Sequence, residues 1–416
     1  MNFQLRANQS IARGHIHLAG SKSISNRVLI IRALCGDHFE IEGLASAADT
    51  DTMQKLLASD GEVYDVGPAG TTFRFLTAYL ALQPGRQILT GSERMLQRPI
   101  GPLVDALNGL GAKITYQKRE GYPPLIIDAP GELAAGSRID IPADISSQFI
   151  SALLMIGPYL PGGLTINLVG ELVSRPYLEM TLRAMDYFGV QTTFEQNVIE
   201  IPEGRYLARP ITVEADWSAA SYHYASAALA PEADITLEGL FPESWQGDAV
   251  CPSLFSGLGV VSTWSDGKLH LSKSEEQKQM VEHDYLECPD IAQTVAAVCA
   301  GLGRPALFTG LETLRIKETD RIAALQTELG KIGVAFAKLP PRFTKTERET
   351  FMIDGQPAWQ EPPLFATYHD HRMAMALAPL AWINPVQIED IDVVDKSYPE
   401  FWKDLVELGI GVEMVE

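Results

Sequence analysis

One phrase occurs six times along the chain, and it constrains the fold more than any other feature. An apolar helical pattern ends at a glycine and a short strand pattern follows, as in ALNGLGAKITYQ and ELGKIGVAFAKL. The glycines that mark the copies are Gly61, Gly111, Gly189, Gly259, Gly333 and Gly409, at spacings of 50, 78, 70, 74 and 76 residues. Because glycine after the last apolar position is a helix C-cap signal, each copy predicts a helix that ends there and a strand behind it.

A second helix pattern precedes each copy and is opened by small or polar residues. SSQFISALLM and PDIAQTVAAVCAGLG are two of the six instances. Several of these helices are apolar nearly all round, which is typical of a helix buried inside its domain. Each repeat therefore predicts strand, helix, strand, helix and strand, with a further strand where VQTTFE and VIEIPE follow one another. The most economical arrangement is an α/β fold of two domains with three repeats each.

The division between the domains is expected just before the fourth repeat. A short strand pattern, RPITVEAD, occupies residues 209–216, and the helix of the fourth repeat begins near Ser218. Residues 2–18 form a strand pattern before the first repeat, and such a strand is expected to complete a sheet of the C-terminal half. The predicted domains are residues 19–216, with repeats one to three, and residues 217–416 completed by 1–18, with repeats four to six.

The starts of the first helices combine hydrogen-bond donors with positive charge. Unpaired N–H groups and the positive end of the helix dipole attract anions there, and hydroxyls add donors. Lys22, Arg27, Arg74 and Arg372 lie in first turns, where the dipole disfavours cations unless an anion compensates them. The six helix starts therefore predict a single site for small, multiply anionic substrates. Plain N-capping is the alternative for any one copy, and for Asp216 and Ser218 of the fourth repeat it is the favoured interpretation.

Composition narrows the class of partner. A formal net charge of -20 makes nucleic acid and anionic membranes poor partners. The opening MNFQLRANQS lacks the apolar region of a secretory signal, and the most apolar stretch, residues 149–160, is interrupted by glycine and proline, so a cytoplasmic protein is expected. Phosphate-loop and dinucleotide glycine patterns are absent from the sequence, and its four cysteines fit no zinc spacing. His369, Asp370 and His371 have no second ligand cluster, so no metal is expected.

Nine motifs occur in a fixed order between about residue 15 and residue 405. They are GSKSISNR, PAGTTFR, QRPIGPLVDAL, SSQFISALLM, SRPYLEMT, PDIAQTVA, RIKETDRI, DHRMAMALAP and DKSYPEF. Together they resemble the 5-enolpyruvylshikimate-3-phosphate (EPSP) synthase family. The resemblance implies two domains, each of three βαβαββ repeats with helices buried inside, and an active site in the cleft between them. That repeat count agrees with the one reached from the marker glycines.

The resemblance also implies the reaction, a step of chorismate and aromatic amino acid biosynthesis. The enolpyruvyl group of phosphoenolpyruvate passes to the 5-hydroxyl of shikimate 3-phosphate, without metal or organic cofactor, in a cytoplasmic monomer. The implied catalytic residues are Asp290 as base, with Glu318 and Lys22 as candidates for proton delivery. The implied shikimate 3-phosphate ligands are Lys22, Ser23, Arg27, Ser146, Ser147, Gln148, Ser174, Arg175 or its backbone, Tyr177, Asp290 and Lys317. The implied phosphoenolpyruvate ligands are Lys22, Gly70, Arg98, Gln148, Arg321, Arg372 and Lys396.

The chain departs from the family pattern in the second repeat. Pro68 stands where the family usually has Asn or Asp, so one phosphoenolpyruvate contact is expected to be lost or supplied by backbone. Phe75 stands where the family usually has proline. Two alternatives to this family stay open: the first is a sister enzyme that shares the fold, and the second is prompted by Pro68. One is a UDP-N-acetylglucosamine enolpyruvyl transferase, although SERMLQR lacks the cysteine of that enzyme, and the other is a non-catalytic binding homologue, against which Lys22, Asp290 and Glu318 together argue.

Overall fold

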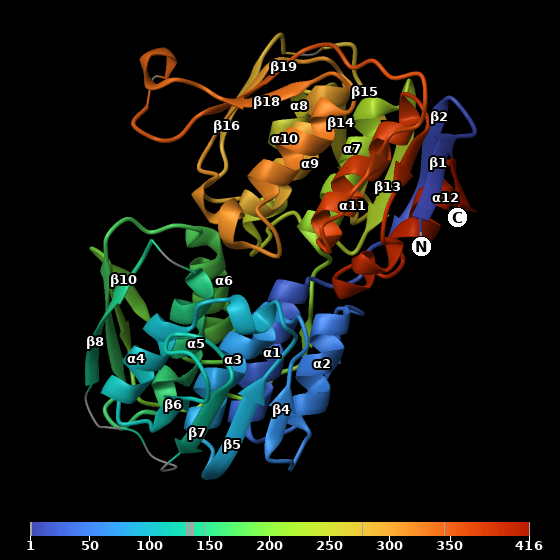
Figure 1. The fold of residues 1–416 in the computed structure, drawn as a ribbon. Coiled ribbons are helices and arrows are strands. Elements are labelled where there is room, and N and C mark those ends of the chain that lie inside the picture. Colours follow the sequence, from blue (N-terminus) through green and yellow to red (C-terminus); the bar gives the residue numbers. More distant parts are fainter. Residues whose placement is uncertain are drawn as a thin grey trace. The chain divides into compact units, whose positions relative to one another are not determined.

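The computed structural model describes residues 2–129, 133, 137–144, 146–276, 278–344 and 346–415. The chain divides into two compact units, shown in Figure 1. The discontinuous unit consists of Met1–Ala19 and Glu214–Glu416, and the continuous unit of Gly20–Val213. The structure thus divides the chain after residues 19 and 213, where the sequence analysis divides it after residues 18 and 216.

Two four-stranded sheets of the continuous unit have the same topology. The first pair of strands is parallel, and the two pairs that follow are antiparallel. Their strand orders are β4 (Val63–Asp65), β5 (Gly85–Thr90), β7 (Leu125–Ala129), β6 (Ile114–Tyr116) and β8 (Ser137–Pro142), β9 (Leu164–Val169), β11 (Val198–Ile201), β10 (Thr193–Glu195). The last two strands of each sheet form an antiparallel hairpin, so each sheet contains the further strand that the sequence pattern allows for.

Three sheets of the discontinuous unit repeat this topology. Their orders are β2 (Ile11–His17), β13 (Glu232–Glu238), β15 (Lys268–Lys273), β14 (Val260–Ser265); β16 (Val281–Asp284), β17 (Ala306–Thr309), β19 (Phe351–Asp354), β18 (Ala335–Lys338); and β20 (Leu364–Phe365), β21 (Val386–Ile388), β1 (Asn2–Ala7), β22 (Ile410–Val415). The single strand expected over residues 2–18 is wrong in detail, because a bend at residues 8–10 divides it into β1 and β2. β1 joins the sheet of the sixth repeat and β2 that of the fourth, so the blue N-terminal strands lie beside C-terminal elements in Figure 1.

The first repeat is shorter than the others. Among the described residues its sheet has two parallel strands, β3 (Ile41–Glu42) and β12 (Ile211–Thr212). The strand after Gly61 is β4, which opens the next sheet, and this accounts for the spacing of 50 residues. Five marker glycines have the positive φ of a left-handed C-cap, between 79° and 107°, but Gly61 does not. The C-cap predicted at Gly61 is therefore wrong.

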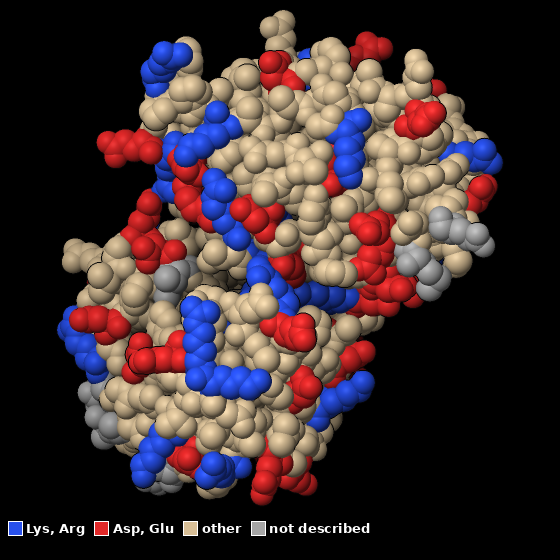
Figure 2. All heavy atoms as spheres, in the orientation of Figure 1, with Lys and Arg blue, Asp and Glu red and all other residues tan. Residues whose placement is uncertain are grey.

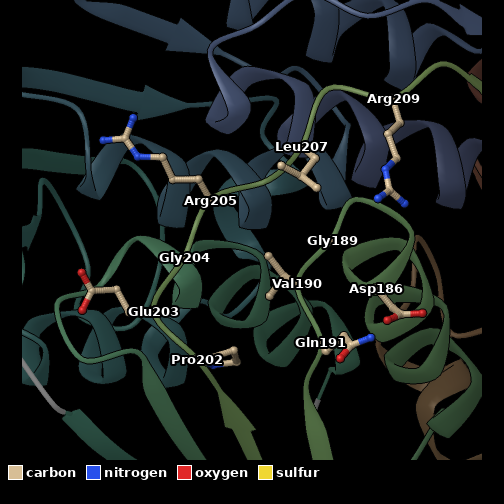
Figure 3. Close-up of a pocket in the computed structure, with 10 residues that line it drawn as sticks. All are labelled: Asp186, Gly189, Val190, Gln191, Pro202, Glu203, Gly204, Arg205, Leu207 and Arg209. Atoms are coloured by element: carbon tan, nitrogen blue, oxygen red, sulfur yellow. The ribbon is translucent and has the colours of Figure 1, made fainter.

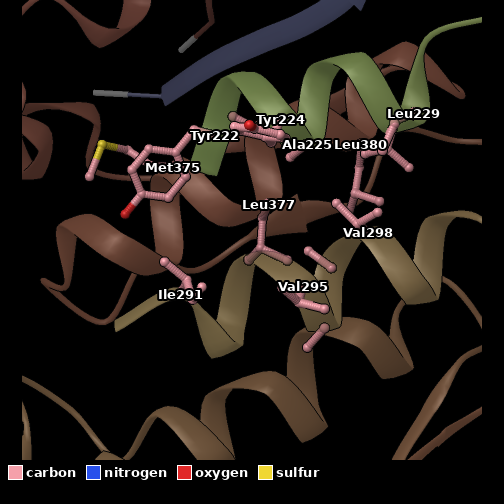
Figure 4. Close-up of a cluster of buried hydrophobic side chains, with 14 of the residues drawn as sticks. Tyr222, Tyr224, Ala225, Leu229, Ile291, Val295, Val298, Met375, Leu377 and Leu380 are labelled. Atoms are coloured by element: carbon pink, nitrogen blue, oxygen red, sulfur yellow. The ribbon is translucent and has the colours of Figure 1, made fainter. Parts of the chain in front are cut away.

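The first helix of each repeat is buried, as its apolar pattern predicts. These helices are α1 (Lys22–Cys35), α3 (Gly70–Ala81), α5 (Ser147–Ile156), α7 (Trp217–Leu229), α9 (Ala292–Gly301) and α11 (His371–Leu377). Every residue of α7, α9 and α11 is buried, and Figure 4 shows Tyr222, Val295 and Leu377 among the side chains packed where the three helices meet. Small residues such as Ala225 allow this close packing.

The second helices are amphipathic, with one face buried and the other exposed. They are α2 (Ala48–Leu57), α4 (Gly101–Gly109), α6 (Arg175–Tyr187), α8 (Cys251–Ser256), α10 (Arg321–Gly330) and α12 (Phe401–Leu408). In α12 the buried positions are Phe401, Asp404, Leu405 and Leu408, the spacing of one helix face.

In the part of the chain that the structure describes, no helix is both long and apolar enough to cross a bilayer.

Candidate active site

The start of α1 carries a cation that is paired with an acid of α2. The Nζ of Lys22 lies 3.1 Å from Oδ2 of Asp49, and the two side chains are 14% and 4% exposed. Thr72, at the start of α3, donates a hydrogen bond to the backbone carbonyl of Asp49, so the starts of α1, α2 and α3 meet at this residue. Asp49 was not among the predicted site residues, because its only sequence signal is an acid in a first turn, which is typical of any helix.

Arg27 connects three helices of the continuous unit. Its guanidinium donates to the Ser23 carbonyl at 2.7 Å, to Oγ1 of Thr181 at 2.7 Å, to Oγ of Ser151 at 3.2 Å and to the Tyr177 carbonyl at 3.1 Å. Burial lowers the pKa of Arg27 to about 10, so the side chain stays charged at neutral pH. In this structure these four acceptors lie in α1, α5 and α6, so a substrate carboxylate would have to join or replace them.

Gly70 and Arg98 lie against each other at the start of α3. A Cβ on Gly70 would lie 2.4 Å from Nη1 of Arg98 and 3.1 Å from Nη1 of Arg74. Glycine therefore provides the space that the Arg98 guanidinium occupies. Thr71, the next residue, accepts a hydrogen bond from Nε2 of Gln148 at 3.0 Å, which joins α3 to α5. The structure thus brings these predicted ligands of phosphoenolpyruvate together within the continuous unit.

The serines predicted to hold a phosphate lie at the starts of α5 and α6. Oγ of Ser146 accepts from the Gln148 N–H at 3.3 Å, so this serine caps α5, and Ser147 is buried beside it. Ser174 precedes α6 with φ 56° and ψ 41°, a left-handed conformation that serine rarely adopts. Tyr177 follows in the first turn and is half-buried. Arg175 points to Glu179 at 2.7 Å on the surface, so only its backbone belongs to this helix start.

The two departures in the second repeat have different surroundings. Pro68 is exposed just before α3. Phe75 is buried, and its ring centroid lies 5.4 Å from the Arg27 guanidinium carbon, within range of a cation–π contact. Phe75 therefore helps to hold Arg27, whereas Pro68 contributes neither a side-chain donor nor an N–H.

Arg321 is the centre of an ion-pair network in the discontinuous unit. Its side chain is 1% exposed and donates to Asp370 at 2.8 and 3.2 Å, to Glu318 at 3.1 Å and to Asp290 at 3.3 Å. Burial alone would lower the pKa of Arg321, but the three carboxylates outweigh it and the pKa is raised. A buried guanidinium in a ring of acids holds those acids in place. Arg321 therefore fits a role in orienting Glu318 and Asp290 at least as well as direct contact with an anion.

Three more cations contact the same carboxylates. Nη2 of Arg372 lies 3.0 Å from Oδ2 of Asp290, and Nζ of Lys317 lies 3.4 Å from its Oδ1. Nζ of Lys396 lies 2.7 Å from Oε1 of Glu318. The structure thus gathers six predicted residues of the fifth and sixth repeats, and Asp370, which the predictions omit, completes the network. These residues lie on η4 (Pro289–Ile291), α10, α11, η8 (Ile391–Lys396) and the loop before α10.

The start of α7 belongs to the fourth repeat. Oδ1 of Asp216 accepts from the N–H groups of Ser218 at 2.8 Å and Ala219 at 3.2 Å, so Asp216 is an N-cap, as the favoured interpretation has it. A residue that the sequence analysis missed lies beside it. Asp248, in η3 (Gly247–Val250), accepts a hydrogen bond from the Ser218 hydroxyl, and its side chain is buried.

Other polar features of the described residues lie apart from these groups. His369 pairs with Asp390 at 2.7 Å on the surface, and within the described ranges no three His, Cys, Asp or Glu side chains are placed to hold a metal ion. On the face that Figure 2 presents, Lys and Arg side chains are interspersed with Asp and Glu. A pocket beyond the end of α6 is lined by Asp186, Glu203, Arg205 and Arg209 among others, none of them a predicted site residue (Figure 3).

The chain is similar over most of its length to proteins of one known family. The family model for EPSP synthase (3-phosphoshikimate 1-carboxyvinyltransferase) matches residues 7–62 and 54–405. A 3-phosphoshikimate 1-carboxyvinyltransferase of Bacteroides fragilis is 46% identical over 100% of both chains, and one of Vibrio cholerae is 35% identical over 95% of this chain and 97% of its own. The solved EPSP synthase of Acinetobacter baumannii has a TM-score of 0.78 at 20% identity, covering 99% of this chain and 100% of its own. That last likeness concerns the fold.

Proposed function

Because the chain belongs to the EPSP synthase family, we propose that it transfers the enolpyruvyl group of phosphoenolpyruvate to the 5-hydroxyl of shikimate 3-phosphate and releases phosphate. The observation that carries the proposal is Asp290, a carboxylate held among Lys317, Arg321 and Arg372. Such a group can accept a proton while its neighbours bind anions. The enzyme is proposed to act in the cytoplasm as a monomer, without metal or organic cofactor, on these two small molecules.

The proposed chemistry assigns one task to each group of residues. Asp290 takes the proton of the 5-hydroxyl of shikimate 3-phosphate while the oxygen of that hydroxyl attacks C2 of phosphoenolpyruvate. In the same step the methylene carbon of phosphoenolpyruvate gains a proton. Glu318 and Lys22 are the candidates for delivering that proton. In the second step the new methyl group loses a proton and the C–O bond to phosphate breaks. The product is the enolpyruvyl ether, and phosphate leaves. The proposed cations stabilise the negative charge that develops in both steps.

The remaining assignments follow the same division. Ser146, Ser147 and Ser174 are proposed to hold the substrate's 3-phosphate, Gln148 and Tyr177 to flank its ring, and Ser23 and Arg27 to take its carboxylate. Support comes from the position of the serines at helix starts, where N–H groups are available to anions. For phosphoenolpyruvate the proposed ligands are Lys22, Gly70, Arg98, Gln148, Arg321, Arg372 and Lys396. Arginine suits both the carboxylate and the phosphate of phosphoenolpyruvate because the donors of the guanidinium form a planar fork.

Phosphate release is the experiment that tests the proposal. The purified full chain is incubated with phosphoenolpyruvate and shikimate 3-phosphate, and inorganic phosphate and the enolpyruvyl ether are measured together. Equal amounts of both products, dependent on shikimate 3-phosphate, are expected. Release with UDP-N-acetylglucosamine but not with shikimate 3-phosphate would favour the sister transferase instead. Binding of both ligands with no release would favour a non-catalytic homologue.

Replacing Gly70 with alanine is expected to weaken phosphoenolpyruvate binding by about tenfold, with a smaller change for shikimate 3-phosphate. The added Cβ would lie 2.4 Å from Nη1 of Arg98 and would push that guanidinium from its present place. KM for each substrate is the measurement. Gly109→Ala is the matched control, since a Cβ there meets nothing within 4 Å. Equal losses for both substrates in Gly70→Ala would contradict the assignment of Gly70.

A further inference from the structure

Asp248 is a buried carboxylate for which the proposed function has no role. Its side chain lies in η3 and is 4% exposed. Oδ2 accepts a hydrogen bond from the Ser218 hydroxyl, while Oδ1 is buried and has no hydrogen-bond partner within the described residues. A buried carboxylate oxygen without a partner is unfavourable, so its retention calls for a physical reason.

The segment that carries Asp248 is fastened to the start of α7. Oε1 of Gln246 accepts from the Trp217 N–H at 3.0 Å, and its Nε2 donates to the Ala215 carbonyl at 2.8 Å. The adjoining Ser218 hydroxyl then binds Asp248. These contacts hold the carboxylate at one place relative to α7, so its charge acts from a defined position.

A short chain of contacts leads from Ser218 to Asp290. Ser218 and Tyr222 are four residues apart on α7 and therefore share a helix face. The Tyr222 hydroxyl lies 3.4 Å from Nη1 of Arg372, whose Nη2 binds Asp290 at 3.0 Å. Asp248, bound to Ser218 at one end of this chain of contacts, is close enough for its charge to interact with those of Arg372 and Asp290.

We propose that Asp248 is a positioning residue for the reaction: its negative charge offsets the cations around Asp290, so that Asp290 remains basic enough to accept the hydroxyl proton. The inference rests on the proposed function. Without the charge of Asp248, Lys317, Arg321 and Arg372 would favour the charged form of Asp290 more strongly and weaken its affinity for a proton. The charge of Asp248 acts in the opposite direction.

The surroundings of Asp248 let its charge change near neutral pH. Burial raises the pKa of Asp248 to about 7, Asp290 and Asp216 add to the rise, and Arg372 and the Ser218 hydroxyl oppose it. From α8 and the turn before η4, Cys251 and Cys288 also face Asp248, and burial raises the pKa of both thiols so that they stay neutral. The carboxylates and Arg372 are therefore the groups whose charges matter here.

Two substitutions at this contact are expected to change the pH dependence in different ways. In the wild type, kcat at saturating substrates should rise through a step near pH 7 as Asp248 ionises. Asp248→Asn should remove that step and lower kcat by about tenfold, because the amide keeps the shape without the charge. Ser218→Ala should move the step to higher pH, because a hydrogen bond that favours the charged form is lost.

Glu328→Gln is the matched control. Glu328 is another buried carboxylate of the same unit, and it contacts Lys331, Tyr368 and the Ala366 N–H rather than the network around Asp290. Its variant should keep the step near pH 7 even if it is less stable. A step that is unchanged in Asp248→Asn, or that moves to lower pH in Ser218→Ala, would overturn the inference.

Urea unfolding supplies a readout that does not depend on turnover. The folded-state pKa of Asp248 lies above its unfolded value of about 4, so its favourable contribution is present below that value and is lost as the pH rises towards about 7. The wild type should therefore lose stability relative to Asp248→Asn across this window. A constant difference would overturn the inference. Absence of turnover in the wild type would instead count against the proposed function.

Discussion

Asp290→Asn is expected to slow turnover by about 10²- to 10⁴-fold, while KM for the two substrates changes far less. The amide keeps the size of the carboxylate and still accepts hydrogen bonds, but it cannot take the proton of the 5-hydroxyl. The measurement is phosphate release at saturating substrates, with the released enolpyruvyl ether quantified in parallel. A residual rate above about one tenth of the wild-type rate would show that another group accepts the proton.

The matched control for this substitution is Asp320→Asn. Asp320 lies close by in the sequence and caps α10 by accepting from the N–H groups of Ile322 and Ala323, both at 3.1 Å. Asparagine is an equally good N-cap, so the helix start should be preserved. Turnover of this variant should stay within about twofold of the wild type. Unfolding of Asp290→Asn must be measured as well, since the loss of one charge also weakens its contacts with Lys317 and Arg372.

Local pattern is sufficient to predict the repeat and the polar and cationic residues at its helix starts. Helix periodicity and C-cap glycines depend on neighbouring residues, so Gly111, Gly189 and the other regular markers could be recognised without knowing the sheets. The cations at Lys22 and Arg372 were informative because they oppose the helix dipole. Local pattern could not show that the strand after Gly61 opens the second sheet, because strand pairing is decided by residues far apart in the sequence.

The supporting acids could not be predicted for a related reason. Asp49 and Lys22 are 27 residues apart, and Asp248 reaches Ser218 across 30 residues. Neither aspartate differs in pattern from a surface acid near a helix start. Only their burial distinguishes these two aspartates from surface acids, and that burial results from packing between elements. Arg321 is a similar case, since RIKETDR resembles a solvated helix surface, whereas the structure buries the arginine among three carboxylates.

Arg321→Met is expected to destabilise the protein by about 3–5 kcal/mol. Methionine fills a similar volume, so the loss comes from the charge. The carboxylate of Asp370 is fully buried, and Arg321 donates two of its hydrogen bonds to it. Urea unfolding of the full chain is the measurement. Arg315→Met is the control, because Arg315 pairs with Glu349 at 2.9 Å at the surface, where an ion pair contributes about 1 kcal/mol or less.

A double variant separates the loss of charge from the loss of packing. Arg321→Met combined with Asp370→Asn removes both members of the closest pair, and asparagine can still cap α11 through the Arg372 N–H that Asp370 now binds at 3.0 Å. If the loss of stability comes from the buried carboxylate of Asp370 that Arg321 no longer pairs with, the double variant should be more stable than Arg321→Met alone. The expected coupling is about 1–3 kcal/mol. Additive losses would mean that Arg321 stabilises the unit through packing, and its role in orienting Glu318 and Asp290 would then lack energetic support.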